Sequence, residues 1–96
     1  MAAYRVIHWR DIPSLVEADD GDQFVRIPLS QRFQDLIDAV AMREGVSEAD
    51  AYLEGWGLSE DRDRPGGAKE VAEQVAALLE GEFQDLIAKR VQVPPP

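Results

Sequence analysis

The hydrophobic pattern of this chain changes its period near residue 30, and this change limits the folds that are possible. Before it lie three short runs rich in β-branched and aromatic residues, 4–9, 14–18 and 23–29. Pro13 ends the first run, and the cluster Asp-Asp-Gly-Asp at 19–22, where Gly21 is free to take a positive φ, separates the other two. Pro28 confines the third run to an edge or an end of a sheet. The simplest product is a three-stranded antiparallel meander.

After residue 30 the apolar residues follow a helical period. Ser30 is the expected N-cap of a helix whose apolar positions, from Phe33 to Val40, recur at i, i+3, i+4 and i+7. Gly45 stands where a C′ glycine is expected to end this helix. A second, shorter helix is expected over 47–56, with Ser47 as its cap.

The second half of the chain predicts one long helix. Residues 58–67 are expected to form a charged loop, and 68–90 carry a continuous apolar stripe that Gly81 weakens in its middle. The pentamer Phe-Gln-Asp-Leu-Ile occurs at 33–37 and again at 83–87, but its flanks differ, so it does not indicate a duplication. We therefore expect a single α+β domain over 1–92, with a small antiparallel sheet of about three strands packed on one face by three helices, and a Pro-rich tail over 93–96.

Composition excludes several classes of function. The formal net charge of −9 is unfavourable for binding nucleic acid or an anionic membrane, because the 10 basic residues are scattered among 19 acidic ones. With no cysteine, the chain has no disulfide, zinc–thiolate site or thiol nucleophile. The first residues lack the basic and long apolar regions of a secretion signal, so we expect a cytoplasmic protein.

No motif in the chain indicates a reaction. His8 is the only histidine, which rules out a two-histidine metal site within one chain, and strand alternation places it on one face with Tyr4 and Val6. Packing is the favoured role for His8. The acidic cluster at 19–22 lacks the spacing of a calcium loop, and 64–70 is not a phosphate loop. We expect no catalytic residue, no cofactor and no metal, and thus no enzyme.

Aromatic and charged residues instead suggest a contact surface. Each aromatic side chain is more often part of a core, but exposed aromatic rings beside an arginine are typical anchors of protein interfaces. The hypothetical surface consists of the corner after the first strand and the region before the charged loop: Trp9, Arg10, Asp11, Tyr52 and Trp56.

Three segments together resemble a known family. They are Tyr-Arg-Val-Ile-His-Trp-Arg-Asp-Ile-Pro at 4–13, the helix with Arg-Phe at 32–33 and Ala-Met-Arg at 41–43, and Ala-Tyr-Leu-Glu-Gly-Trp at 51–56. The chain resembles the small bacterial virulence factor domain family, closely over about 4–57 and beyond that only in helical character. Position 8 is more usually tyrosine in that pattern, which argues against a catalytic His8. The resemblance implies no established activity, but it implies an association with one-carbon and methyl-transfer enzymes, including folate-dependent ones.

These observations favour a non-catalytic accessory or adaptor subunit of a larger cytoplasmic enzyme. Two alternatives stay open. One is a small-ligand binder that stacks a conjugated ring on an exposed tryptophan, and the other is a self-assembling structural protein whose long helix carries more apolar surface than three strands cover.

Overall fold

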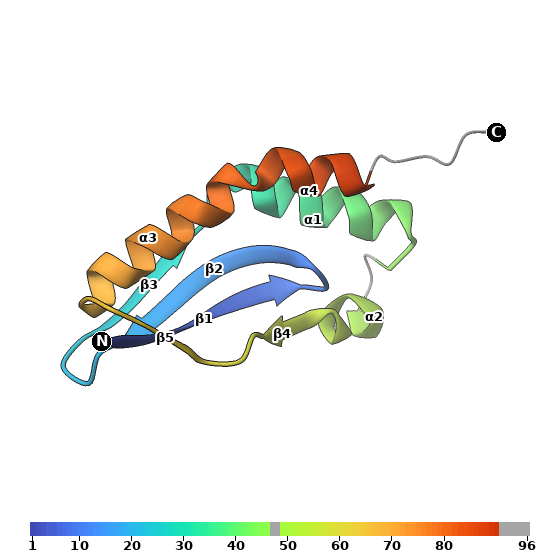
Figure 1. Ribbon diagram of the computed structural model, residues 1–96. Coiled ribbons are helices and arrows are strands. Elements are labelled where there is room, and N and C mark those ends of the chain that lie inside the picture. The colour runs from blue at the N-terminus through green and yellow to red at the C-terminus, as the bar shows by residue number, and fades with distance from the viewer. Residues whose placement is uncertain (47–48, 91–96) are drawn as a thin grey trace.

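The computed structural model describes residues 1–46 and 49–90, which form one antiparallel sheet with three helices on one side (Figure 1). A short fourth helix, α2, lies on the other side near one end of the sheet. The elements in chain order are β1 (Ala2–Trp9), β2 (Ile12–Asp19), β3 (Phe24–Pro28), α1 (Gln31–Arg43), α2 (Ala49–Glu54), β4 (Trp56–Leu58), β5 (Arg62–Arg64), α3 (Ala68–Gly81) and α4 (Phe83–Arg90).

The first strand lies in the middle of the sheet. The strand order is β3-β2-β1-β4, and β5 also pairs with β1, alongside the half that β4 leaves free. The register between β1 and β2 shifts after Ile7, so that Ile7 lies opposite Leu15 but His8 lies opposite Pro13. This irregularity bends the hairpin near its tip.

The predicted meander is confirmed. β1, β2 and β3 follow one another, and the turn before β3 contains Gly21 with a φ of 92°. Asp20 holds this turn, because its Oδ1 accepts hydrogen bonds from the backbone N–H groups of Asp22 and Gln23 at 2.9 and 2.8 Å. Pro28 is the last residue of an edge strand, where a missing N–H is tolerated.

The sheet has more strands than the three that the sequence predicted. The described residues form five strands, because 56–58 and 62–64 pair with β1 where a helix end and a loop were expected. Each of these strands has only three residues, and their sequences, Trp-Gly-Leu and Arg-Asp-Arg, carry no strand pattern of their own. Their pairing with β1 comes from tertiary structure, as is common for strands.

The helices also differ in number from the expected three. The stripe over 68–90 divides into α3 and α4, with Glu82 between them, so the weakness predicted at Gly81 is a break. α1 ends as expected, with Gly45 at a φ of 69°. Ser47, the expected cap of α2, and the tail over 93–96 lie outside the described residues.

Ser30 occupies the N-cap position of α1 without capping it through its side chain. Its hydroxyl instead donates to Glu80 Oε1 at 2.7 Å, and its backbone N–H donates to Glu80 Oε2 at 2.6 Å. Arg32 joins the same carboxylate at 3.0 Å. Partial burial would raise the pKa of Glu80, but these hydrogen bonds outweigh it and hold the pKa below its ordinary value. Glu80 therefore ties the end of α3 to the start of α1.

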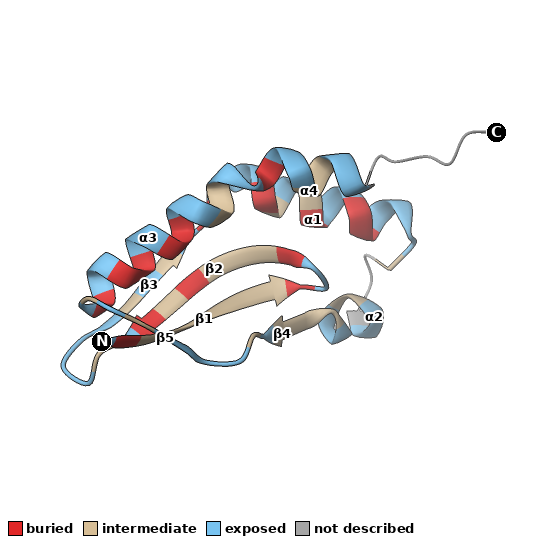
Figure 2. Cartoon of the chain, in the orientation of Figure 1, coloured by how far each residue is buried: buried red, intermediate tan, exposed pale blue. Residues whose placement is uncertain are grey.

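The core lies between the helices and the sheet, and Figure 2 shows the buried residues on the side of α3 that faces the strands. Phe33 and Phe83, the first residues of the two identical pentamers, meet there with ring centroids 4.8 Å apart in an edge-to-face arrangement. The largest fully buried side chains are Trp9, Ile12, Val16, Phe33, Ile37 and Val71.

Candidate functional site

The two faces of the sheet differ in what covers them. Side chains of directly opposed residues in neighbouring strands lie on the same face, so the register assigns each strand position to one side. Val16 and Ala18 face α3 and are fully buried. The other side is here called the uncovered face, because within residues 1–46 and 49–90 only α2 lies over it, at one end. Its residues are Ala3, Arg5, Ile7, Leu15, Glu17, Asp19, Phe24, Arg26, Pro28, Leu58 and Asp63.

One row of the uncovered face is apolar and crosses four strands. Pro28 lies opposite Leu15, Leu15 opposite Ile7, and Ile7 opposite Leu58. Leu58 is 61% exposed, and the two central residues, Ile7 and Leu15, are only partly buried. We call these four residues the apolar row. An apolar row that crosses four strands without a helix over it favours a contact surface on this face.

The next row is charged and neutralises itself. Glu17 Oε2 lies 2.9 Å from Arg26 Nε, and Glu17 Oε1 lies 3.4 Å from Arg5 Nη1. Arg5 also donates to both carboxylate oxygens of Asp61, at 2.7 and 3.2 Å. The hydrogen bond from Arg5 lowers the pKa of Asp61, and the contact with Asp61 raises the pKa of Arg5. We call Arg5, Glu17, Arg26 and Asp61 the charged ladder.

Beyond the charged ladder lies an acidic row. Phe24 lies opposite Asp19, Asp19 opposite Ala3, and Ala3 opposite Asp63. Phe24 is 54% exposed. Asp19 Oδ1 accepts a hydrogen bond from the N–H of Gly21. No ion pair is formed by Asp19 or Asp63 with any residue in the described ranges 1–46 and 49–90.

At the opposite end, α2 closes the uncovered face over Trp9. The Trp9 side chain is 0% exposed, its Nε1–H donates to the carbonyl of Tyr52 at 2.8 Å, and its ring lies 5.8 Å from that of Tyr52. Trp56 packs edge-on against Tyr52 at 6.1 Å and is half-buried. The expectation that Trp9 belongs to a contact surface thus needs correction, because the ring is in the core. Tyr52 and Trp56 lie where α2 meets the apolar row.

Arg10 and Asp11 form the exposed tip of the β1–β2 hairpin. Arg10 has a φ of 54°, a conformation that is strained for a residue other than glycine. Several contacts hold it there: its N–H donates to the carbonyl of Gly55 at 2.7 Å, its guanidinium bonds to Glu44 at 2.6 Å and it lies 4.7 Å from the centre of the Trp9 ring. These two residues are therefore separated from the apolar row by the buried Trp9.

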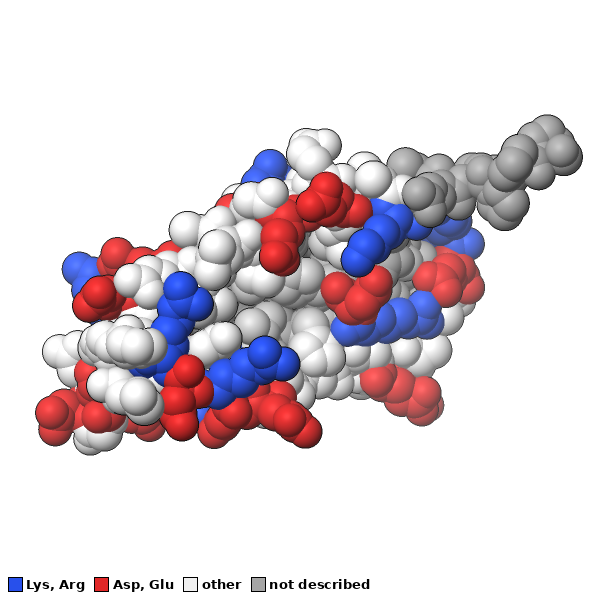
Figure 3. All heavy atoms as spheres, in the orientation of Figure 1, with Lys and Arg blue, Asp and Glu red and all other residues white. Residues whose placement is uncertain are grey.

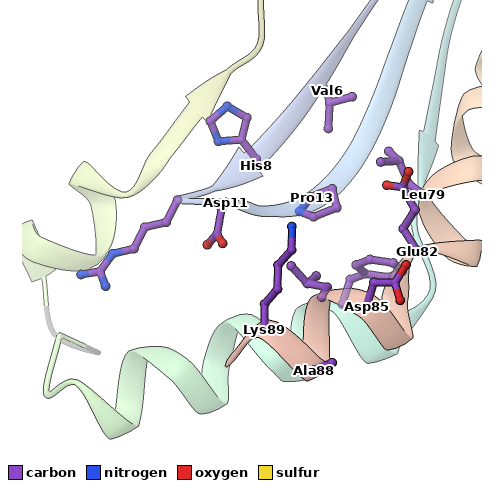
Figure 4. Close-up of a pocket in the computed structure, with 12 residues that line it drawn as sticks. Val6, His8, Asp11, Pro13, Leu79, Glu82, Asp85, Ala88 and Lys89 are labelled. Atoms are coloured by element: carbon purple, nitrogen blue, oxygen red, sulfur yellow. The ribbon is translucent and has the colours of Figure 1, made fainter. Parts of the chain in front are cut away.

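A cleft of about 880 Å³ lies on the helix side of the hairpin, between β1 and α4 (Figure 4). Val6, Phe33, Leu79 and Leu86 provide apolar walls. Lys89 extends from α4 toward the hairpin across the opening. In Figure 3, acidic and basic groups surround this hollow without one sign prevailing.

His8 lies at the sheet side of this cleft, on the same face as Val6 as the sequence predicted. Its ring rests against Gly57 of β4, where an added Cβ would lie 3.2 Å from His8 Cε1. His8 Nδ1 is buried and has no hydrogen-bond partner among the described residues. The ring is thus positioned by packing against Gly57 rather than by a hydrogen bond to Nδ1 from any described residue.

The chain matches a protein-family model. The family model described as virulence factor covers residues 7–91, which is most of the chain. The chain belongs to the virulence factor family. The match reaches past residue 57, so the similarity includes β5, α3 and α4. No curated protein and no solved structure matches the chain.

Two further findings bear on the kind of site. Over the ranges that the structure describes, no helix has the length and apolar character needed to cross a bilayer. In the same ranges no three histidine or acidic side chains come together in a way that could hold a metal ion.

Proposed function

We propose that this virulence factor family member is a non-catalytic accessory or adaptor subunit that docks on a larger cytoplasmic enzyme through the uncovered face. The observation that carries the proposal is the apolar row, in which Pro28, Leu15, Ile7 and Leu58 form a continuous strip across four strands. A folded monomer normally covers such a strip with a helix, as α3 covers the other face.

The surroundings of the apolar row also suit a protein interface. The charged ladder borders it on one side and half-buried Trp56 on the other, so an apolar centre has a polar rim and an aromatic anchor. The family resemblance supplies the class of partner, a one-carbon or methyl-transfer enzyme. Arg10 and Asp11 lie outside this surface, whereas Tyr52 and Trp56 border it.

The test compares two single variants with the same chemical change. Leu58→Gln alters the apolar row. Leu78→Gln is the control, because Leu78 lies on α3 and is 54% exposed, similar to the 61% of Leu58. Tagged wild-type and variant proteins are used to recover partners from the native cytoplasm, with quantitative mass spectrometry. We expect one enzyme recovered in stoichiometric amount by the wild type and Leu78→Gln and several-fold less by Leu58→Gln. Equal recovery by both variants, or no stoichiometric partner, would contradict the proposal.

The cleft beside His8 supports a second candidate function, the binding of a small ligand. Its apolar walls, which include Val6, Leu79 and Leu86, fit a flat ring, and neither Trp9 nor Trp56 lines the cleft. Amide NMR spectra recorded with an added neutral pterin test this. Shifts at Val6, Leu79 and Leu86 would support binding, and an unchanged spectrum would exclude it for this class of ring.

Self-assembly is the third candidate, and the structure reduces the reason for it. The stripe over 68–90 that suggested excess apolar surface is divided into α3 and α4, and its buried positions already face the sheet and α1. Sedimentation equilibrium of the isolated protein gives the mass directly, and a monomer excludes this candidate.

A further inference from the structure

We propose that the occupant of the uncovered face is an amphipathic helix of a basic partner, with its apolar stripe on the apolar row and lysine or arginine side chains directed toward Asp19 and Asp63. This inference rests on the proposed function and specifies the chemistry of its partner.

The edges of the sheet are less suitable for docking than its face. β3 is five residues long and ends at Pro28, and β4 has only three residues. A short edge with a proline offers few backbone groups to an added strand. An incoming segment would therefore bury more apolar surface on the face than it would by extending the sheet.

The dimensions of the apolar row suit one helix. Four neighbouring strands spaced at about 4.8 Å place Pro28 and Leu58 roughly 14 Å apart. A helix of about ten residues has that length, and its diameter of roughly 10 Å covers the row and part of the charged ladder. The acidic row lies four residues, about 13 Å, along the strands from the apolar row, so it is approached by the long lysine or arginine side chains on that flank of the helix. On the opposite face, α3 shows that a single helix can lie across β1, β2 and β3.

The charges on the uncovered face determine whether a basic or an acidic partner is favoured. The charged ladder contains two arginines and two carboxylates that already pair with one another, so it attracts neither sign strongly. The charges left on the face are those of Asp19 and Asp63, which lie on either side of Ala3. They act in the field of a chain whose net charge is −9. A basic helix is therefore favoured, both in encounter and in contact.

The same charges argue against a second copy of this chain as the occupant. Each of the two copies would bring a net charge of −9. Among the described residues of the uncovered face, the basic side chains Arg5 and Arg26 are already paired with Glu17, so neither copy offers a free basic group to Asp19 or Asp63 of the other. Like charges brought together at an interface oppose association.

The experiment uses two synthetic helical peptides of about 14 residues, enough for the row and both flanks. Both peptides have leucine at the same positions. At all remaining positions one peptide carries lysine and the other carries glutamate. Binding is measured by tryptophan fluorescence, to which both Trp9 and Trp56 contribute, and by amide NMR shifts in β1 and β4. The double variant Asp19→Asn/Asp63→Asn is compared with Asp35→Asn/Asp38→Asn on α1, which removes the same charge from the opposite side.

We expect the lysine peptide to bind and the glutamate peptide not to bind. The Asp19→Asn/Asp63→Asn protein should bind the lysine peptide about fivefold more weakly, because two exposed charge contacts are lost, while the α1 control stays close to the wild type. Leu58→Gln, which alters the apolar row, should weaken binding of the lysine peptide.

Two outcomes would overturn the inference. If the glutamate peptide binds equally well, or if both charge variants weaken binding equally, the partner is not selected by Asp19 and Asp63. If the isolated protein sediments as a dimer that Leu58→Gln dissociates, a second copy is the occupant. The proposed function is tested separately, by the recovery of partners with Leu58→Gln and Leu78→Gln, so either of these results can be obtained without contradicting it.

Discussion

The two faces of β2 show how differently one strand can be used. Val16 and Leu15 are neighbours in sequence, but Val16 is 0% exposed beneath α3 whereas Leu15 remains partly open on the uncovered face. On the covered side α3 presents Ala68 and Ala72, whose small side chains allow the helix to approach the strands closely. The uncovered side carries the charged ladder instead. The comparison teaches that apolar residues on both faces of a strand need not serve one core.

The charged ladder has a second effect on this contrast. Arg5, Glu17 and Arg26 divide the apolar row from exposed Phe24, so the apolar surface remains a narrow strip. Charges placed on an open sheet in this way oppose indiscriminate sheet-to-sheet association. The uncovered face is thus suited to a selective partner.

The largest expected effect comes from placing the same charge on each face. In Val16→Asp a carboxylate would be buried without a partner, and we expect a loss of about 4 kcal/mol or more, which leaves most of the protein unfolded. In Leu15→Asp the carboxylate can reach water, and we expect a loss of about 1 kcal/mol. Urea unfolding followed by circular dichroism measures both. Equal losses would mean that the face we call uncovered is packed.

A smaller effect is expected where α2 closes the uncovered face. A Cβ at Gly55 would overlap the indole of Trp9, with Cε2 only 2.8 Å away, so Gly55→Ala should cost about 1–3 kcal/mol through overpacking. Gly81→Ala is the matched control, because Gly81 is the last residue of α3 and a Cβ added there would have no atom within 4 Å. This substitution should be neutral or stabilise the protein by up to about 1 kcal/mol. Thermal unfolding compares them. A stable Gly55→Ala protein would show that α2 is not fixed on Trp9.

The smallest expected effect is a dependence on pH that arises on the covered side. Asp20 Oδ2 accepts the N–H of Ala68, the first residue of α3, at 2.9 Å, and this bond, with those from Gln23 and Asp22, lowers the pKa of Asp20. Because the folded pKa lies below the unfolded value of about 3.8, its contribution is present above that pH and is lost as the pH falls through the folded pKa. In Asp20→Asn the free energy of unfolding should be lower at pH 7 and less dependent on pH below about 4.

Urea unfolding at pH 7 and at pH 3 measures this effect. Asp22→Asn is the control, since Asp22 contributes only its backbone N–H to the turn. If Asp22→Asn and Asp20→Asn change the pH dependence equally, the bond to Ala68 has no part in it.

Much of the fold could be predicted because its signals are local. The meander over β1–β3, the glycine turn at Gly21 and the end of α1 at Gly45 all follow from residues within a few positions of one another. β4 and β5 could not be predicted, because three-residue strands acquire their structure only by pairing with β1. The role of Glu80 as a partner of Ser30, fifty positions away, has no local signal either.

The candidate site was less predictable than the fold. The sequence identified Tyr52 and Trp56, which border the apolar row, but it also selected Trp9, which is buried. Exposure depends on which helix lies over which face, and no residue of the strand determines that alone. Alternation was a usable signal, because it placed His8 on one face with Val6, but the different burial of Ile7 and Trp9 on the other face depends on α2.

The central position of β1 has a consequence for the growing chain on the ribosome. The first strand can pair with β2 as soon as the hairpin emerges, but the backbone groups on its other edge wait for residues 56–64. Until that stretch is synthesised, a nascent chain has an open strand edge, the kind of surface that chaperones protect. Closing that edge with a segment some fifty residues downstream makes completion of the sheet a late, non-local step in biogenesis.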